Sequence, residues 1–183
     1  MQAYIVHGYD ASPQSHWFAQ LKEKFEANGV KTEILSLPAP AAPKLNEWLA
    51  VLKERVILGR QTYLVGHSLG CPTILNFLQK YGANDGVGGV TLVSGLAKPL
   101  RGVEILDEFT SGGFDFAFIK SRALNRAVIA AKDDYVVPFE FSRELAEQLD
   151  AKFYPVQKGG HFLDRDGFTS FDLVYEVTIE MMK

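Results

Sequence analysis

The chain of 183 residues has a single cysteine, Cys71, and lacks an excess of positive charge. One cysteine excludes an internal disulfide framework and a cysteine-rich zinc site. The net charge is −3, so no basic surface favours binding to nucleic acid or acidic lipid. We therefore expect neither a nucleic-acid partner nor a bound metal.

Long apolar runs and cofactor motifs are also missing. The first residues lead directly into Tyr4-Ile5-Val6 without a basic targeting region, and no run reaches membrane-spanning length. No G-x-G-x-x-G follows the first predicted strand, and no Walker pattern occurs. The sequence therefore predicts a cytoplasmic protein that acts without a membrane or a cofactor.

Apolar residues are nevertheless abundant enough for a large core, at 47% of the chain, and we expect one domain over residues 1–183. Stretches with helical spacing of apolar residues separate short apolar runs. This alternation predicts a parallel sheet with helices on both faces, and ligands bind such sheets beyond the carboxyl ends of the strands. The predicted strands are residues 2–6, 31–36, 62–65, 89–93, 125–131 and 152–155.

Two connecting segments have distinctive sequences. Ser12 followed by Pro13 indicates the start of a first helix, which continues through Trp17. Residues 95–122 have poor periodicity and a cluster of phenylalanines, and we interpret them as a short lid-like insertion.

The most informative stretch is Gly66-His67-Ser68-Leu69-Gly70, a G-x-S-x-G pattern between a predicted strand and a predicted helix. A tight strand-to-helix turn leaves no room for side chains beside the serine, and glycine removes them. The helix also points free N–H groups at the serine. We predict that Ser68 is a nucleophile; the alternative is a serine that caps the helix.

A serine nucleophile needs a base and an orienting acid. His161 is the only histidine after Ser68, and Gly159-Gly160 before it provide a loop that can bring its ring to the serine. The order serine, acid, histidine is typical of α/β-hydrolases. Asp133 and Asp134 both end the predicted fifth strand, so either could be the acid.

Further motifs run along the chain, namely Val6-His7-Gly8-Tyr9, Ser15-His16-Trp17, Asp133 to Pro138 and Gly160-His161-Phe162. Together with the tight turn at Gly66 to Gly70, which we call the nucleophile elbow, these motifs make the chain resemble the compact serine hydrolases of the YdeN/RBBP9-like family, within the α/β-hydrolase superfamily. The resemblance implies a three-layer α/β/α sandwich with a six-stranded sheet in the order 2-1-3-4-5-6 and a short lid. In this family the acid commonly precedes a proline by four residues, which favours Asp134 over Asp133.

The resemblance also implies the remaining parts of the site. The backbone N–H groups of Tyr9 and Leu69 would form the oxyanion hole. His16 and Trp17 match a family pattern near the site and are candidate substrate-binding residues, although the spacing of Trp17 equally fits a core residue. Phe114 and Phe116 could give the lid an apolar, substrate-binding lining.

These residues together predict a serine hydrolase that cleaves a small carboxylic ester through an acyl-enzyme intermediate. Amide and thioester substrates remain open because the same triad serves all three. A second hypothesis is a protein-binding module on a hydrolase scaffold, with residues 109–118 as the docking surface. A third is a lyase or a haloperoxidase-like enzyme of the same fold.

Overall fold

The computed structural model describes residues 1–82 and 86–183, and its centre is one six-stranded parallel sheet. The strand order is β2-β1-β3-β4-β5-β6, which confirms the predicted topology. The strands are β1 (Gln2–Val6), β2 (Lys31–Ile34), β3 (Gly59–His67), β4 (Val87–Val93), β5 (Ala123–Ala131) and β6 (Lys152–Val156).

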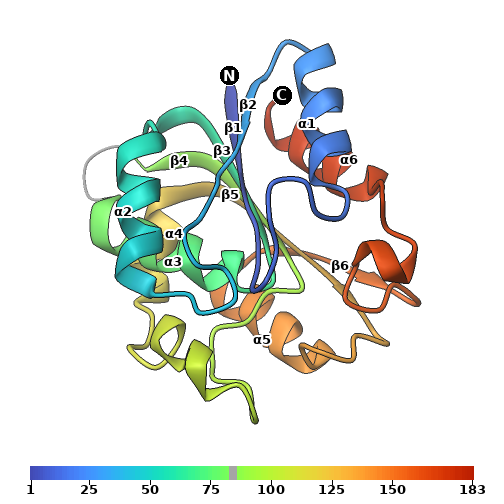
Figure 1. The fold of residues 1–183 in the computed structure, drawn as a ribbon. Helices are drawn as coiled ribbons and strands as arrows, with labels where there is room; N and C mark the ends of the chain where they lie inside the picture. The colour runs from blue at the N-terminus through green and yellow to red at the C-terminus, as the bar shows by residue number, and fades with distance from the viewer. Residues whose placement is uncertain (83–85) are drawn as a thin grey trace.

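Helices cover both faces of the sheet, as the alternating pattern predicts (Figure 1). One face carries α1 (Phe18–Ala27) and α6 (Asp172–Met181). The other face carries α2 (Leu45–Arg55), α3 (Gly70–Tyr81), α4 (Phe116–Arg122) and α5 (Phe139–Leu149). Two short 3-10 helices are η1 (Glu104–Phe109) and η2 (Asp164–Asp166).

The strands bury side chains on both faces, because successive residues of a strand point to opposite sides. In β1, Ala3 and Ile5 pack with α1 and α6, whereas Tyr4 and Val6 pack with α2 and α3. The sheet therefore separates two apolar cores. Among the described residues, no helix is long and apolar enough to cross a membrane.

The first helix begins later than the sequence predicts. Residues 12–17 form turns, in which the Ser15 N–H donates to the Ser12 carbonyl at 3.0 Å. His16 has a φ of 54°, a left-handed conformation that a right-handed helix cannot contain. Helix α1 consequently starts at Phe18, and the expectation that Ser12 and Pro13 open it is wrong.

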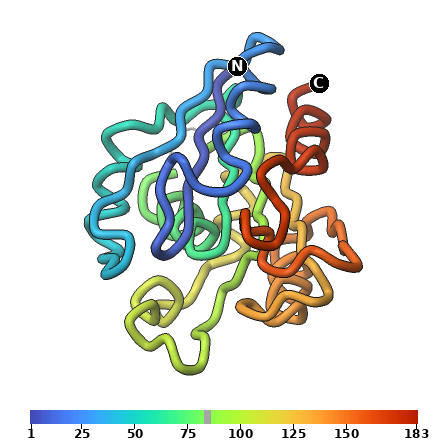
Figure 2. The backbone as a smooth tube through the Cα atoms, turned by 45° about the vertical axis from the view of Figure 1, so that its right-hand side comes forward, coloured from blue at the N-terminus to red at the C-terminus, as the bar shows by residue number. Residues whose placement is uncertain are grey.

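The segment 95–122 carries η1 and α4 and follows the carboxyl end of β4. Figures 1 and 2 place its first part, residues 95–115, at the end of the molecule opposite the two chain termini. Helix α4 then contacts α3 and leads back to Ala123, which pairs with Val87 at the start of β4. The part that carries η1 therefore lies at the end of the sheet where the elbow also emerges.

The two outer strands differ from the inner four. Strand β2 has only four residues and begins at the exposed Lys31. Strand β6 begins at the exposed Lys152 and contains Pro155, which pairs with Ala130 of β5.

Candidate active site

The sharp turn between β3 and α3 presents Ser68 at the carboxyl end of the sheet. Its φ of 52° is left-handed, which is costly for a residue other than glycine. A Cβ atom at Gly70 would lie 2.1 Å from the Val6 carbonyl oxygen, and one at Gly66 would lie 2.9 Å from Ile74 Cδ1. The two glycines of the pattern thus allow the elbow to pack against β1 and α3.

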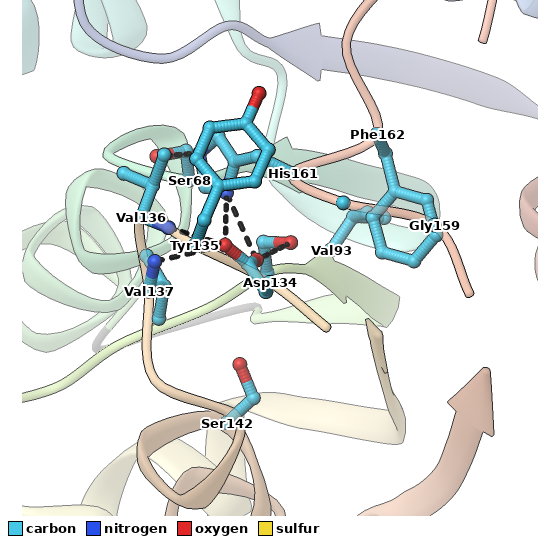
Figure 3. Close-up of polar contacts among 12 residues, drawn as sticks. Ser68, Val93, Asp134, Tyr135, Val136, Val137, Ser142, Gly159, His161 and Phe162 are labelled. Atoms are coloured by element: carbon cyan, nitrogen blue, oxygen red, sulfur yellow. Dashed lines mark hydrogen bonds and ion pairs between the residues drawn. The ribbon is translucent and has the colours of Figure 1, made fainter. Parts of the chain in front are cut away.

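Three side chains from separate loops meet in one line of hydrogen bonds (Figure 3). His161 Nε2 lies 2.9 Å from Ser68 Oγ. On the other side of the ring, His161 Nδ1 lies 3.0 Å from Asp134 Oδ1 and 2.9 Å from Oδ2. The structure therefore brings Ser68, His161 and Asp134 together, with 5% of the His161 and 1% of the Asp134 side chain exposed.

The Asp134 carboxylate is held by donors on its own loop and by Ser94, directly after β4. Oδ1 accepts from the N–H groups of Val136 and Val137, each at 2.9 Å. Oδ2 accepts from Ser94 Oγ at 2.7 Å. These hydrogen bonds fix the direction in which the carboxylate faces the His161 ring. Sequence reasoning missed Ser94, whose one signal is its place directly after a predicted strand.

Asp133 points elsewhere and has a different task. Its Oδ1 accepts from the N–H of Gly159 at 2.8 Å and of Gly160 at 3.0 Å. These hydrogen bonds lower the pKa of Asp133 below its usual range. Of the two neighbouring aspartates, Asp134 bonds to the His161 ring and Asp133 holds the loop before it.

The predicted oxyanion-hole residues converge beside Ser68. A Cβ atom at Gly8 would lie 3.0 Å from Ser68 Cβ and 3.6 Å from the Leu69 nitrogen, so the Gly8–Tyr9 peptide lies against the elbow. Within the described parts of the chain, the backbone N–H groups of Tyr9 and Leu69 donate to no protein acceptor. They are free to donate to a ligand at the start of α3, where the helix dipole adds partial positive charge.

His7 fixes the peptide that carries the Tyr9 N–H. The Leu37 N–H donates to His7 Nε2 at 3.4 Å, so Nδ1 carries the proton and donates to the Gly8 carbonyl at 2.9 Å. Burial lowers the pKa of His7, which keeps this neutral form. In the sequence, His7 is part of the Val6-His7-Gly8-Tyr9 motif, but no pattern there indicates that its ring holds the Gly8–Tyr9 peptide.

A cavity of about 350 Å³ opens over Ser68. Its apolar side includes three aliphatic residues from the 95–122 segment, and its polar side includes His16, His161 and Arg165. Tyr9 and Val136 also line it, yet 41% and 39% of their surfaces are exposed, so its mouth is apolar as well. The three aliphatic residues are Leu100, Val103 and Leu106.

Only one of the four candidate substrate-binding residues borders this cavity. His16 lines it, whereas Trp17 is fully buried and donates from Nε1 to the Phe162 carbonyl at 3.1 Å. Phe114 and Phe116 are absent from the lining and pack against the core under α2 and α3. The chain turns back into α4 at Phe116, which directs these rings to the core, so aliphatic rather than aromatic side chains form the apolar wall.

Asp166 is a further residue whose role the sequence does not reveal. Its Oδ2 accepts from the N–H of His161 at 3.0 Å and of Leu163 at 3.1 Å. Among residues 1–82 and 86–183, no group of His, Cys, Asp and Glu side chains is placed to hold a metal ion.

Comparison with known sequences finds close relatives along nearly the whole chain. A family model described as serine hydrolase matches residues 3–179. The hydrolase YdeN of Bacillus subtilis (strain 168) is 52% identical over 177 residues, which cover 96% of this chain and 93% of that protein. The serine hydrolase RBBP9 of Rattus norvegicus is 26% identical over 148 residues, 80% of this chain and 77% of that protein.

Solved structures agree with this relationship. The crystal structure of the ydeN gene product from B. subtilis superposes with a TM-score of 0.95 at 51% identity, covering 98% of this chain and 97% of that chain. Est1E from Butyrivibrio proteoclasticus has a TM-score of 0.75 at 14% identity, covering 99% of this chain and 88% of that chain, and so shares the fold.

Proposed function

The chain belongs to the serine hydrolase family, and from that premise we propose that it cleaves small carboxylic esters by acyl transfer to Ser68. The observation that carries the proposal is the unbroken line of hydrogen bonds from Ser68 Oγ through His161 to Asp134. A docking module would not need this buried and fully bonded arrangement, so the geometry favours catalysis over protein binding.

Acylation begins when Ser68 Oγ attacks the ester carbonyl while His161 Nε2 takes the hydroxyl proton. Asp134 holds the Nδ1 proton of the ring and stabilises the imidazolium that forms. The carbonyl oxygen becomes an oxyanion, to which the Tyr9 and Leu69 N–H groups donate. His161 then gives its proton to the departing alkoxide, which leaves as an alcohol, and Ser68 keeps the acyl group.

Deacylation repeats the same steps with water as the nucleophile. His161 accepts a proton from the water as its oxygen attacks the acyl carbon. The proton then returns to Ser68 Oγ as the ester bond to the serine breaks, and the carboxylic acid departs. The enzyme is restored without a cofactor.

The shape of the cavity supports a small aliphatic acyl group. Its volume of about 350 Å³ is near the lower end for ligand sites. Leu100, Val103 and Leu106 offer an apolar wall, against which an aliphatic chain loses its contact with water.

Labelling with a fluorophosphonate probe tests the proposal, with the adduct located by intact mass and peptide mapping. We expect one adduct on Ser68, absent in Ser68→Ala and strongly slowed in His161→Ala. The matched control is Ser170→Ala, which removes an exposed serine that is not hydrogen-bonded to Ser68, Asp134 or His161 and should label like the wild type. Hydrolysis of p-nitrophenyl acetate should be lost in Ser68→Ala, strongly slowed in His161→Ala and unchanged in Ser170→Ala. A folded Ser68→Ala variant with wild-type turnover would contradict the proposal.

A further inference from the structure

The loop that carries His161 has a strained backbone. Gly160 and Phe162, on either side of His161, have φ values of 53° and 56°. A left-handed conformation at a bulky residue such as Phe162 persists only when surrounding groups hold it. The position of the His161 ring therefore depends on whatever fixes this backbone.

Side chains from distant parts of the chain, and Asp166 of the loop itself, bond to several backbone groups of the loop. Asp133 and Asp166 hold N–H groups on both sides of His161, as described above, and the Asp164 N–H donates to His16 Nδ1 at 3.2 Å. The carbonyl groups have their own donors. His67 Nε2 lies 2.9 Å from the His161 carbonyl, and Trp17 Nε1 lies 3.1 Å from the Phe162 carbonyl.

We propose that His67 and Trp17 are positioning residues that set the place of the His161 ring relative to Ser68. This inference rests on the proposed function, because it assigns these side chains to the same reaction. Both act from beneath the loop through its carbonyl oxygens. Neither needs to touch the substrate.

His67 links the nucleophile and the base directly. A carbonyl oxygen only accepts hydrogen bonds, so His67 Nε2 carries the proton and donates it. The His67 Nδ1 atom is buried and has no partner among the described residues, and burial holds the pKa of His67 well below its usual range. A neutral ring thus lies 5.0 Å, centroid to centroid, from the ring that becomes positive during the reaction.

Trp17 supplies the second donor from the layer of α1. Its side chain is fully buried and its ring packs edge-on against His67, with centroids 5.8 Å apart, and against Phe171 at 5.9 Å. The indole N–H is therefore fixed in direction. This explains why Ser15-His16-Trp17 lies near the site although Trp17 does not border the cavity.

The experiment compares variants that delete only the donor. Trp17→Phe and His67→Phe keep an aromatic ring, and His67→Gln keeps an N–H donor within reach of the carbonyl. Trp48→Phe is the matched control, since Trp48 is also fully buried and donates from Nε1 to a carbonyl, that of Pro38, at 2.9 Å. The readouts are kcat and KM for p-nitrophenyl acetate, the rate of fluorophosphonate labelling, and the urea midpoint.

We expect Trp17→Phe and His67→Phe to lower kcat and the labelling rate by about 100-fold with little change in KM, as a small displacement of a catalytic group does. His67→Gln should recover much of that loss. Trp48→Phe should lose stability like Trp17→Phe and keep its kcat. Wild-type kcat in folded Trp17→Phe, or an equal loss in Trp48→Phe, would overturn the proposal.

A spectroscopic readout separates this inference from the proposed function. The proton in the His161 Nδ1 to Asp134 hydrogen bond should give a low-field NMR signal that weakens or shifts in Trp17→Phe and His67→Phe. An unchanged signal in both variants would refute positioning. A wild-type protein that gives the signal yet neither takes the probe nor cleaves the ester would instead refute the proposed function. If His67→Phe fails to fold, Trp17→Phe carries the test alone.

Discussion

Replacing Asp134 by asparagine changes one atom of the side chain and should reverse the proton arrangement of His161. Oδ1 faces the N–H groups of Val136 and Val137, so the asparagine oxygen must stay on that side. The new NH2 group then takes the place of Oδ2, 2.9 Å from His161 Nδ1.

Oδ1 also lies 3.0 Å from Nδ1, but it already accepts from two N–H groups, and an NH2 group 2.9 Å from a protonated Nδ1 would face another donor. Because an NH2 group can only donate, it favours the tautomer in which Nδ1 lacks its proton. Nε2 then carries the proton and cannot accept one from Ser68 Oγ. Ser94 can adapt, because its hydroxyl can rotate to accept a hydrogen bond from the new NH2 group. The variant therefore loses activity because the His161 ring is in the wrong tautomer, and not because its packing changes. The wrong tautomer lowers kcat by about 10⁴-fold. At 1.36 kcal/mol for each factor of ten, this equals about 5.4 kcal/mol.

Asp133→Asn is the control, since it makes the same chemical change one residue away. Its remaining oxygen can still accept from Gly159 and Gly160, so we expect kcat within about threefold of wild type, in the range of a surface substitution. The assay is p-nitrophenyl acetate hydrolysis at neutral pH, with the urea midpoint of each variant measured beside it. A folded Asp134→Asn protein within tenfold of wild type would refute the reasoning, as would a larger loss in Asp133→Asn.

Three further predictions follow from the geometry. Gly70→Ala places a Cβ 2.1 Å from the Val6 carbonyl oxygen and should lower the free energy of unfolding by about 3 kcal/mol or more, whereas Gly112→Ala, with no atom nearby, should change it little; urea unfolding of both decides this. Val103→Phe narrows the cavity and should raise kcat/KM for p-nitrophenyl acetate relative to p-nitrophenyl hexanoate by about tenfold or more. An unchanged ratio of the two kcat/KM values would show that this wall does not bind the acyl group. The pKa of Asp133 is lower in the folded protein than in the unfolded chain, so its carboxylate stabilises the fold above the unfolded-state pKa, and this stabilisation disappears as the pH falls through the folded-state pKa. From about pH 5 downward, the urea midpoint should therefore fall less in Asp133→Asn than in wild type.

The sequence predicted the sheet and the elbow because both rest on local patterns. Alternating apolar runs and helical spacings follow from contacts within each element, and the glycines around Ser68 follow from one tight turn. Strand order was added by the family resemblance. Local signals were weaker where two rules competed: Ser12 and Pro13 have the residue types of a helix start, yet His16 turns the chain and delays the helix to Phe18.

The contacts around His161 could not be predicted from spacing. Trp17 and Phe162 are 145 residues apart, and His67 and His161 are 94 apart, so no periodic pattern relates them. A buried tryptophan gives the same helical spacing whether or not its indole N–H bonds to a functional loop. The phenylalanines of residues 109–118 likewise suggested a lining, because composition does not show which way a lid faces.

The two edge strands of the sheet, β2 and β6, affect whether molecules of the protein associate at high concentration. An open parallel sheet exposes unpaired backbone groups at each border, where a second molecule could add a strand. Here β2 is only four residues long and starts with a lysine, and β6 combines Lys152 with Pro155, which has no N–H to donate. Charge repulsion and the missing donor disfavour intermolecular strand addition at these borders. Replacing Lys31 and Pro155 by valine would therefore be expected to raise the tendency to aggregate while leaving the end of the sheet that carries Ser68 unchanged.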